Sequence, residues 1–298
     1  SIAKKLKVPP IIIGLTIVAM GTSLPETAVS VTASLVQNNE LAVSNVVGSN
    51  IFNLMFVIGV CSILTPIMVQ KATVVRDIPL SLGCALFLLV LGISGLGDKA
   101  GMTLGHADGV IFLIVFAGYI FTMVRSAMKA RAAGQKIEIE GVEECDNMKE
   151  LSYGKSILFL IVGAAAIAFG GDLTVDTASR IAIELGMSQT LVGLTIVSIG
   201  TSLPELVTSV VAARKNEVDM AVGNAIGSNI FNILMVLGIA SAISPLQLIG
   251  ENVIDIIVLV VFSVVVWIFG ATKKKISRTE GIAMICMYLC YSVYIIMR

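Results

Sequence analysis

A stretch that combines hydroxyl, proline and carboxylate side chains occurs twice in this chain, each time inside a long apolar run. It reads GTSLPE at residues 21–26 and again at residues 200–205. A second stretch, GSNIFN, occurs at residues 48–53 and 227–232. Because residues i and i+4 lie on one face of a helix, each stretch brings two oxygen-bearing side chains together. The four pairs are Thr22 with Glu26, Ser49 with Asn53, Thr201 with Glu205, and Ser228 with Asn232.

These eight side chains predict a binding site for a hard cation. Carboxylate, amide and hydroxyl groups all supply oxygen, and calcium takes about six to eight oxygen ligands. A site for a softer metal would show cysteine or histidine instead. An ionised carboxylate near the centre of a bilayer costs about 2.5 to 3.5 kcal/mol, and such groups mark ion or proton pathways. Glu26 and Glu205 therefore indicate more than a kinked helix.

Proline in the same blocks predicts that both helices are broken at Pro25 and Pro204. Proline has no N–H and its ring crowds the preceding turn, so the carbonyls of Gly21 and Gly200 lose their helical partners. Irregular backbone at membrane depth is tolerated only where it is buried in protein or lines a polar cavity. The breaks therefore add backbone oxygen atoms to the same region.

Small residues and asparagines in these blocks have a packing interpretation. Small residues let membrane helices approach closely, and this role is predicted at four glycines. They are Gly14, Gly48, Gly193 and Gly227. Asn50 and Asn229 lie on another helix face from the eight oxygen-bearing side chains, and we interpret them as residues that hold helices together.

Acids outside the blocks are expected within about one turn of helix ends, where water can reach them. They are Asp77, Asp108, Asp172, Asp176, Asp255 and Glu280. The single histidine, His106, is expected at a membrane interface without a transport role.

The composition is that of a multi-pass membrane protein. The chain is 56% hydrophobic and 13% charged, with a mean hydropathy of +0.97, whereas soluble domains carry about 25% charged residues. A bilayer core about 30 Å thick needs about 20 apolar residues per helix. Nine stretches qualify: 8–36, 41–64, 74–96, 106–125, 154–173, 188–213, 218–243, 252–270 and 277–297. The alternating segments of a membrane barrel are absent, so we expect helices.

The chain is also a duplication, because a shift of 179 residues superposes both pairs of blocks without a gap. The second copy is preceded by an apolar stretch that the first copy lacks within this chain. The predicted fold class is therefore an all-α integral membrane protein with an inverted repeat of five helices each, of which nine are present. An odd number of helices makes the two repeats enter the membrane from opposite sides, as in many secondary transporters.

Three segments follow from this plan: a first repeat at 1–125 without its first helix, a linker at 126–153, and a second repeat at 154–298. When the connectors are assigned to alternate sides of the membrane, all but three of the 20 Lys and Arg residues lie on one side. Because positively charged loops face the cytoplasm, we expect the linker there, in a protein of the cell membrane. The zero net charge gives no support for a nucleic-acid partner.

The paired GTSLPE and GSNIFN blocks resemble the alpha-repeats of the sodium/calcium exchanger family, within the cation/calcium antiporters. The resemblance implies alternating access, with calcium and sodium moving in opposite directions through a shared site. It matches the central carboxylates of the family to Glu26 and Glu205. It matches the hydroxyl and carbonyl ligands to Thr22, Ser23, Ser49, Thr201, Ser202 and Ser228.

The resemblance also matches amide or acid positions to Asn53 and Asn232, and the backbone carbonyls of Ala19 and Ser198 to a weaker, outer sodium site. Some members of the family carry Asp at the position of Asn232. Stoichiometry and the use of potassium therefore stay open at this point.

We expect a secondary antiporter that exchanges sodium for calcium, not an enzyme, with no cofactor besides the transported ions. Calcium/proton exchange is the alternative, because a carboxylate pair can also carry protons. A cation channel is more remote, since it would not need a symmetric closed site. A hydrolase that uses Ser23 with Glu26 lacks an activating base. The expected partners are calcium, sodium and the lipid bilayer, and the sequence predicts no oligomeric state.

Overall fold

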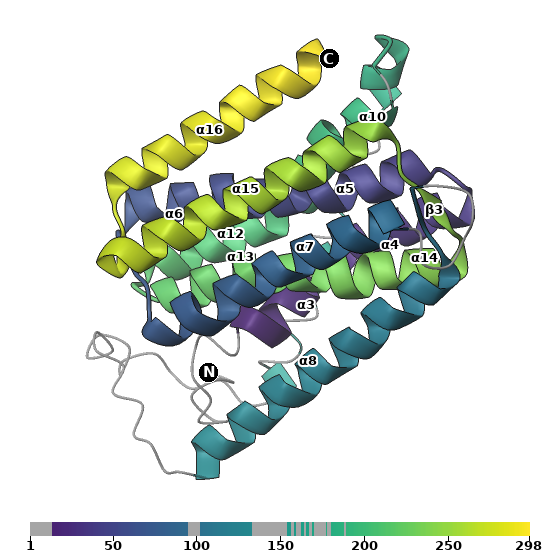
Figure 1. Cartoon of the computed structure of the whole chain (residues 1–298). Helices are drawn as coiled ribbons and strands as arrows, with labels where there is room; N and C mark the ends of the chain where they lie inside the picture. The colour runs from purple at the N-terminus through teal and green to yellow at the C-terminus, as the bar shows by residue number, and fades with distance from the viewer. Residues whose placement is uncertain are drawn as a thin grey trace.

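The computed structural model describes residues 14–94, 102–132, 180–187 and 189–298, together with isolated positions between 154 and 177. These residues form a bundle of helices, with α16 along one edge and α8 along the other (Figure 1). Six helices are long and apolar enough to cross a membrane, and a bent helix pair adds a seventh. In this part of the chain the predicted helical membrane architecture is confirmed.

The first half begins with the GTSLPE helix, in which η denotes a π-helical turn. This helix comprises η1 (Gly14–Val18), α3 (Ala19–Thr22) and α4 (Leu24–Leu35). The GSNIFN helix is continuous through α5 (Asn39–Ile51), η2 (Phe52–Val57) and α6 (Ile58–Leu64). The half continues with η3 (Thr73–Asp77), α7 (Ile78–Ser94) and α8 (His106–Ala132). α8 passes the predicted boundary at residue 125 because AMKARA at residues 127–132 consists of strong helix formers.

The second half has a similar sequence of elements. Its GTSLPE helix comprises α10 (Gln189–Val192), η5 (Gly193–Val197), α11 (Ser198–Thr201) and α12 (Leu203–Arg214). Its GSNIFN helix comprises α13 (Val218–Phe231), η6 (Asn232–Leu237) and α14 (Gly238–Ile243), followed by α15 (Gly250–Lys273) and α16 (Arg278–Met297). Most of the predicted helix at 154–173 and most of the predicted linker lie outside the described residues, so the count of nine helices stays a prediction.

Two short antiparallel strand pairs connect the halves, and the sequence did not predict them. β1 (Ile67–Met68) pairs with β4 (Lys275–Ile276), and β2 (Thr103–Leu104) pairs with β3 (Leu246–Gln247). β3 lies at one end of the bundle, and the turn between α15 and α16, which contains β4, lies at the other end (Figure 1). Each end of the bundle is therefore closed by a contact between the first and the second half.

Three of the four glycines lie where helices cross closely. A Cβ on Gly227 would lie 2.8 Å from the Cα of Leu15, and a Cβ on Gly193 would lie 2.9 Å from the Cβ of Ser44. A Cβ on Gly48 would overlap Ser198. The predicted packing role is confirmed at these positions, and the crossings bring α5 against the second GTSLPE helix and α13 against the first.

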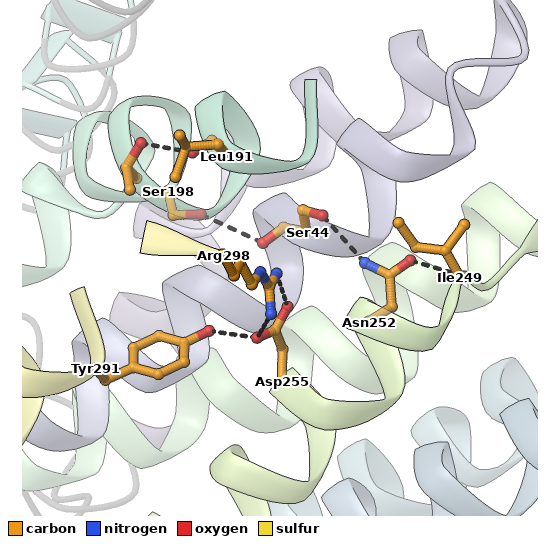
Figure 2. Close-up of polar contacts among 9 residues, drawn as sticks. Ser44, Leu191, Ser198, Ile249, Asn252, Asp255, Tyr291 and Arg298 are labelled. Carbon is orange, nitrogen blue, oxygen red and sulfur yellow. Dashed lines mark hydrogen bonds and ion pairs between the residues drawn. The ribbon is translucent and has the colours of Figure 1, made fainter. Parts of the chain in front are cut away.

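The expectation that acids near helix ends are reached by water is wrong for Asp77, Asp108 and Asp255, which are all buried. At the start of α8, the backbone N–H of Gly105 donates a capping hydrogen bond to Asp108 Oδ2, at 2.9 Å. Asp255 receives both arms of the Arg298 guanidinium at 2.9 and 2.8 Å and the Tyr291 hydroxyl at 3.0 Å (Figure 2). Neighbouring chain segments therefore bond both oxygens of Asp255, whereas Asp77 Oδ2 and Asp108 Oδ1 are buried without a hydrogen-bond partner among the described residues.

Candidate cation-binding site

Both GTSLPE helices are interrupted at the serine of the block. Ser23 has φ −83° and ψ 10°, and Ser202 has φ −89° and ψ 6°. In the second half, the helices on either side of Ser202 are bent by 48°. Pro25 and Pro204 lie in the first turns of α4 and α12, where backbone N–H groups have no intrahelical partner and a missing N–H costs little. Each break leaves a glutamate in the first turn of the helix that follows.

Glu26 and Glu205 are fully buried, and each is held by the other half of the chain. Ser202 donates its hydroxyl to Glu26 Oε1 at 2.9 Å, and Ser23 donates to Glu205 Oε1 at 3.2 Å. Ser228 donates a second bond to Glu205 Oε1 at 3.1 Å. The two GTSLPE blocks, at residues 21–26 and 200–205, thus meet at one place in the bundle.

Four oxygen atoms in this region are buried without a hydrogen-bond partner. They are Oε2 of Glu26, Oε2 of Glu205, Oδ1 of Asn53 and Oδ1 of Asn232, and they make up half of the eight such atoms among the described residues. Buried polar atoms are normally hydrogen-bonded, so each exception needs an explanation. Two carboxylate and two amide oxygens are suitable ligands for a hard cation such as calcium or sodium.

Hydroxyl groups of the predicted pairs also meet across the two halves. Thr22 Oγ1 lies 3.4 Å from Ser228 Oγ, and Thr201 Oγ1 lies 3.4 Å from Ser49 Oγ. With Ser23 and Ser202, these side chains connect the four helices that carry the blocks. The structure therefore brings together the eight side chains that spacing singled out and the two serines that only the resemblance indicated.

The carbonyls of Ala19 and Ser198 already accept hydrogen bonds. Ala19 O accepts the backbone N–H of Ser23 at 3.0 Å, and Ser198 O accepts that of Ser202 at 3.1 Å. Both carbonyls lie on the turn directly before the break. Ala19 O also accepts the Thr22 hydroxyl at 3.3 Å, and Ser198 O accepts those of Ser49 and Thr201 at 3.4 Å. A cation at these oxygens would have to replace the hydroxyl bonds, and the outer sodium site stays a prediction.

Two further asparagines, Asn45 and Asn224, belong to this region and were missed. Thr201 donates to Asn45 Oδ1 and Thr22 donates to Asn224 Oδ1, both at 3.2 Å. Both asparagines are fully buried. Each lies four residues before the serine of its GSNIFN block, so extending the i, i+4 pattern by one step toward the N-terminus would have found them.

Soft-metal chemistry finds no support in the part of the chain that the structure describes. No group of three or more His, Cys, Asp or Glu residues there could hold a metal ion. The candidate site instead mixes two carboxylates with neutral amides and hydroxyls, which is the donor set of alkali and alkaline-earth cations.

Residues 1–125 and 155–297 match the sequence model of the sodium/calcium exchanger protein family. This chain belongs to the sodium/calcium exchanger family. Sodium/calcium exchanger MaX1 of Methanosarcina acetivorans is 32% identical over 317 residues, which cover 98% of this chain and 91% of the relative. Uncharacterized membrane protein MJ0091 of Methanocaldococcus jannaschii is 35% identical over 288 residues, which cover 97% of this chain and 87% of the relative.

A solved structure of the sodium-calcium exchanger NCX_Mj, soaked with Na⁺ and Ca²⁺, has the same fold. It superposes with a TM-score of 0.77 at 33% sequence identity, over 97% of this chain and 88% of the other. This exchanger is therefore an integral membrane protein of a family of cation/calcium antiporters, which are transporters and not enzymes.

Proposed function

We propose that this exchanger moves calcium across the membrane in exchange for sodium, by alternating access to the site at Glu26 and Glu205. One observation carries the proposal: the four buried oxygens of Glu26, Glu205, Asn53 and Asn232 have no hydrogen-bond partner among the described residues. A cation at this place would supply the missing partner for all four atoms. The hydroxyls of Thr22, Ser49, Thr201 and Ser228 would complete its coordination.

The charge of the site fits the proposed cargo. The two carboxylates contribute about −2 when ionised, and the amides of Asn53 and Asn232 add nothing. One calcium ion or two sodium ions would neutralise this charge and relieve the repulsion between Glu26 and Glu205. Both ions can therefore use the same ligands, but not at the same time, which is the basis of exchange.

Reciprocal contacts support an alternating-access mechanism. Ser23 bonds Glu205 while Ser202 bonds Glu26, and the strand pairs β1–β4 and β2–β3 close opposite ends of the bundle. A site built equally by two similar halves can open toward either end by the same kind of motion. We further propose that the halves are oppositely oriented repeats, at 1–125 and 154–298, in the cell membrane, with the linker at 126–153 in the cytoplasm.

The experiment uses the full chain reconstituted in lipid vesicles. An outward sodium gradient alone should drive calcium uptake, and Glu26→Gln should abolish it. Ser263→Ala is the matched control, because Ser263 is buried but bonds only the carbonyl of Leu259 on its own helix. Sodium gradients that move no calcium in folded protein would contradict the proposal.

Calcium/proton exchange is the second candidate function. It is favoured by the two buried carboxylates, which can each bind a proton in place of a cation. In the same vesicles a proton gradient would then drive calcium uptake with choline replacing all sodium. Under sodium coupling, protons should only compete with calcium, so that acidification raises the half-saturating calcium concentration without lowering the maximal rate.

A further inference from the structure

Asn50 and Asn229 form a reciprocal contact at the crossing of α5 and α13. Both side chains are buried. Asn50 Nδ2 donates to the main-chain oxygen of Asn229 at 3.2 Å, and Asn229 Nδ2 donates to the main-chain oxygen of Asn50 at 3.0 Å. This exchange of bonds agrees with the sequence-based interpretation that the two residues hold helices together.

The contact also fixes which end of each amide faces which way. A main-chain oxygen only accepts hydrogen bonds, so the Asn50 atom that bonds Asn229 O must be the amide nitrogen. The other atom of that amide is then the oxygen, Oδ1. The same reasoning orients Asn229, whose nitrogen is fixed by the main-chain oxygen of Asn50.

The two oriented oxygens in turn orient the candidate ligands. Asn50 Oδ1 accepts the amide nitrogen of Asn232 at 3.1 Å, and Asn229 Oδ1 accepts that of Asn53 at 3.2 Å. The nitrogens of Asn232 and Asn53 are thereby used, and their oxygens are the atoms left without a partner. A rotated amide would instead present N–H groups, which repel cations.

We propose that Asn50 and Asn229 are positioning residues that hold Asn232 and Asn53 so that both present oxygen, and not N–H, to the transported cation. The inference rests on the proposed function, because it assigns a role to residues that contact the site without binding the ion. Ligands held in place by such outer contacts bind metals more tightly than ligands left free to rotate.

Two substitutions at Asn50 separate positioning from packing. Asn50→Leu and Asn50→Asp both lose the donor to Asn229 O, but Asp keeps an acceptor for the amide nitrogen of Asn232. Positioning predicts that Leu raises the half-saturating calcium concentration of sodium-driven uptake by about tenfold or more, while Asp does not. Equal changes in both variants, or a change in maximal rate only, would show that Asn50 contributes packing alone.

A double-mutant cycle removes the effect of the charge that Asp introduces. If Asn50 acts through Asn232, then Asn50→Leu should change calcium dependence in the parent but not in Asn232→Leu. Additive effects would overturn the proposal. If Asn50→Leu is not recovered folded, Asn229→Leu with Asn53→Leu provides the equivalent cycle in the other half.

Asn252→Leu is the control for loss of a buried asparagine. Asn252 bonds Ser44 Oγ at 3.2 Å and the backbone N–H of Ile249 (Figure 2). It contacts no candidate ligand, so calcium dependence should stay unchanged.

If Glu26→Gln still transports calcium, the proposed function itself fails. If Glu26→Gln is inactive and the Asn50 cycle is additive, only the positioning role is wrong.

Discussion

The two halves of this exchanger make matching contacts around the candidate site, but unlike contacts on the helices that flank it. At the centre, Ser23 and Ser202 hold the glutamate of the opposite half, and Asn50 and Asn229 exchange identical bonds. On the flanking helices the equivalence is lost. Tyr291, on the last helix of the second half, donates to Asp255, whereas Tyr119, on the last helix of the first half, donates to the main-chain oxygen of Leu15. Under the proposed alternating access, an ion bound from both sides constrains the centre, while the periphery needs only to pack.

The acids on the flanking helices show the same contrast. Asp255, on α15, is fully buried and paired with Arg298, whose side chain is 17% exposed. Asp77, at the start of α7, is paired only with its neighbour Arg76, which is 44% exposed. Both carboxylates are buried, but the arginine is mostly buried in one half and half exposed in the other. The two halves can differ here without changing the site.

The largest expected effect tests the equality of the centre. Glu26→Gln and Glu205→Gln should each abolish calcium flux, because either change removes half of the negative charge that balances a divalent ion. Uptake of radioactive calcium into vesicles driven by a sodium gradient measures this. A variant at one position that keeps a substantial rate would show that the two carboxylates have unequal roles, and normal exchange in both would remove them from the site.

The second prediction concerns stability at the periphery. Arg298→Ala should destabilise the fold by about 3 to 5 kcal/mol, because it leaves the buried Asp255 carboxylate without a cation. Arg76→Ala should cost less, because water already screens the half-exposed Arg76 and its charge contributes less to the pair, although Asp77 is buried as well. Thermal unfolding of both variants in the same detergent compares them. Similar losses would mean that the two ion pairs are equivalent after all.

Sequence reasoning found the centre because its signals are local. The i, i+4 spacing placed Thr22 beside Glu26, and the exact repeat of that spacing implied that the two copies do the same work. The burial of Asp255 could not be found this way, because its partners Tyr291 and Arg298 lie 36 and 43 residues away. The bonds between Asn50 and Asn229 span 179 residues. Their role in orienting amides depends on which atom faces which, and only a three-dimensional arrangement contains that information.

A third prediction concerns the amides of Asn53 and Asn232. Because amides are neutral, the negative charge of the site comes from Glu26 and Glu205 only. Such a site cannot neutralise calcium together with potassium, so calcium uptake should proceed at full rate when choline replaces all potassium. Asn232→Asp adds a negative charge and should alter cation selectivity or introduce a dependence on potassium or pH. If the two halves contribute equally, Asn53→Asp should have the same effect as Asn232→Asp. An absolute potassium requirement in the unmodified protein would reveal a further anionic ligand.

The smallest expected effect tests an inequality at the centre. Ser228 donates to Glu205 Oε1 at 3.1 Å, whereas its counterpart Ser49 bonds Ser198 O and Thr201 at 3.4 Å and has no hydrogen bond to Glu26. Hydrogen bonds to charged groups contribute about 1.5 to 3 kcal/mol, and neutral ones about 0.5 to 1.5 kcal/mol. Ser228→Ala should therefore raise the half-saturating calcium concentration by about tenfold, and Ser49→Ala by about threefold. Calcium titrations of sodium-driven uptake in matched vesicles provide the comparison. Equal shifts would mean that both serines act only as ligands of the ion. A larger shift for Ser49→Ala would mean that Glu26, and not Glu205, is the carboxylate that its serine holds more tightly.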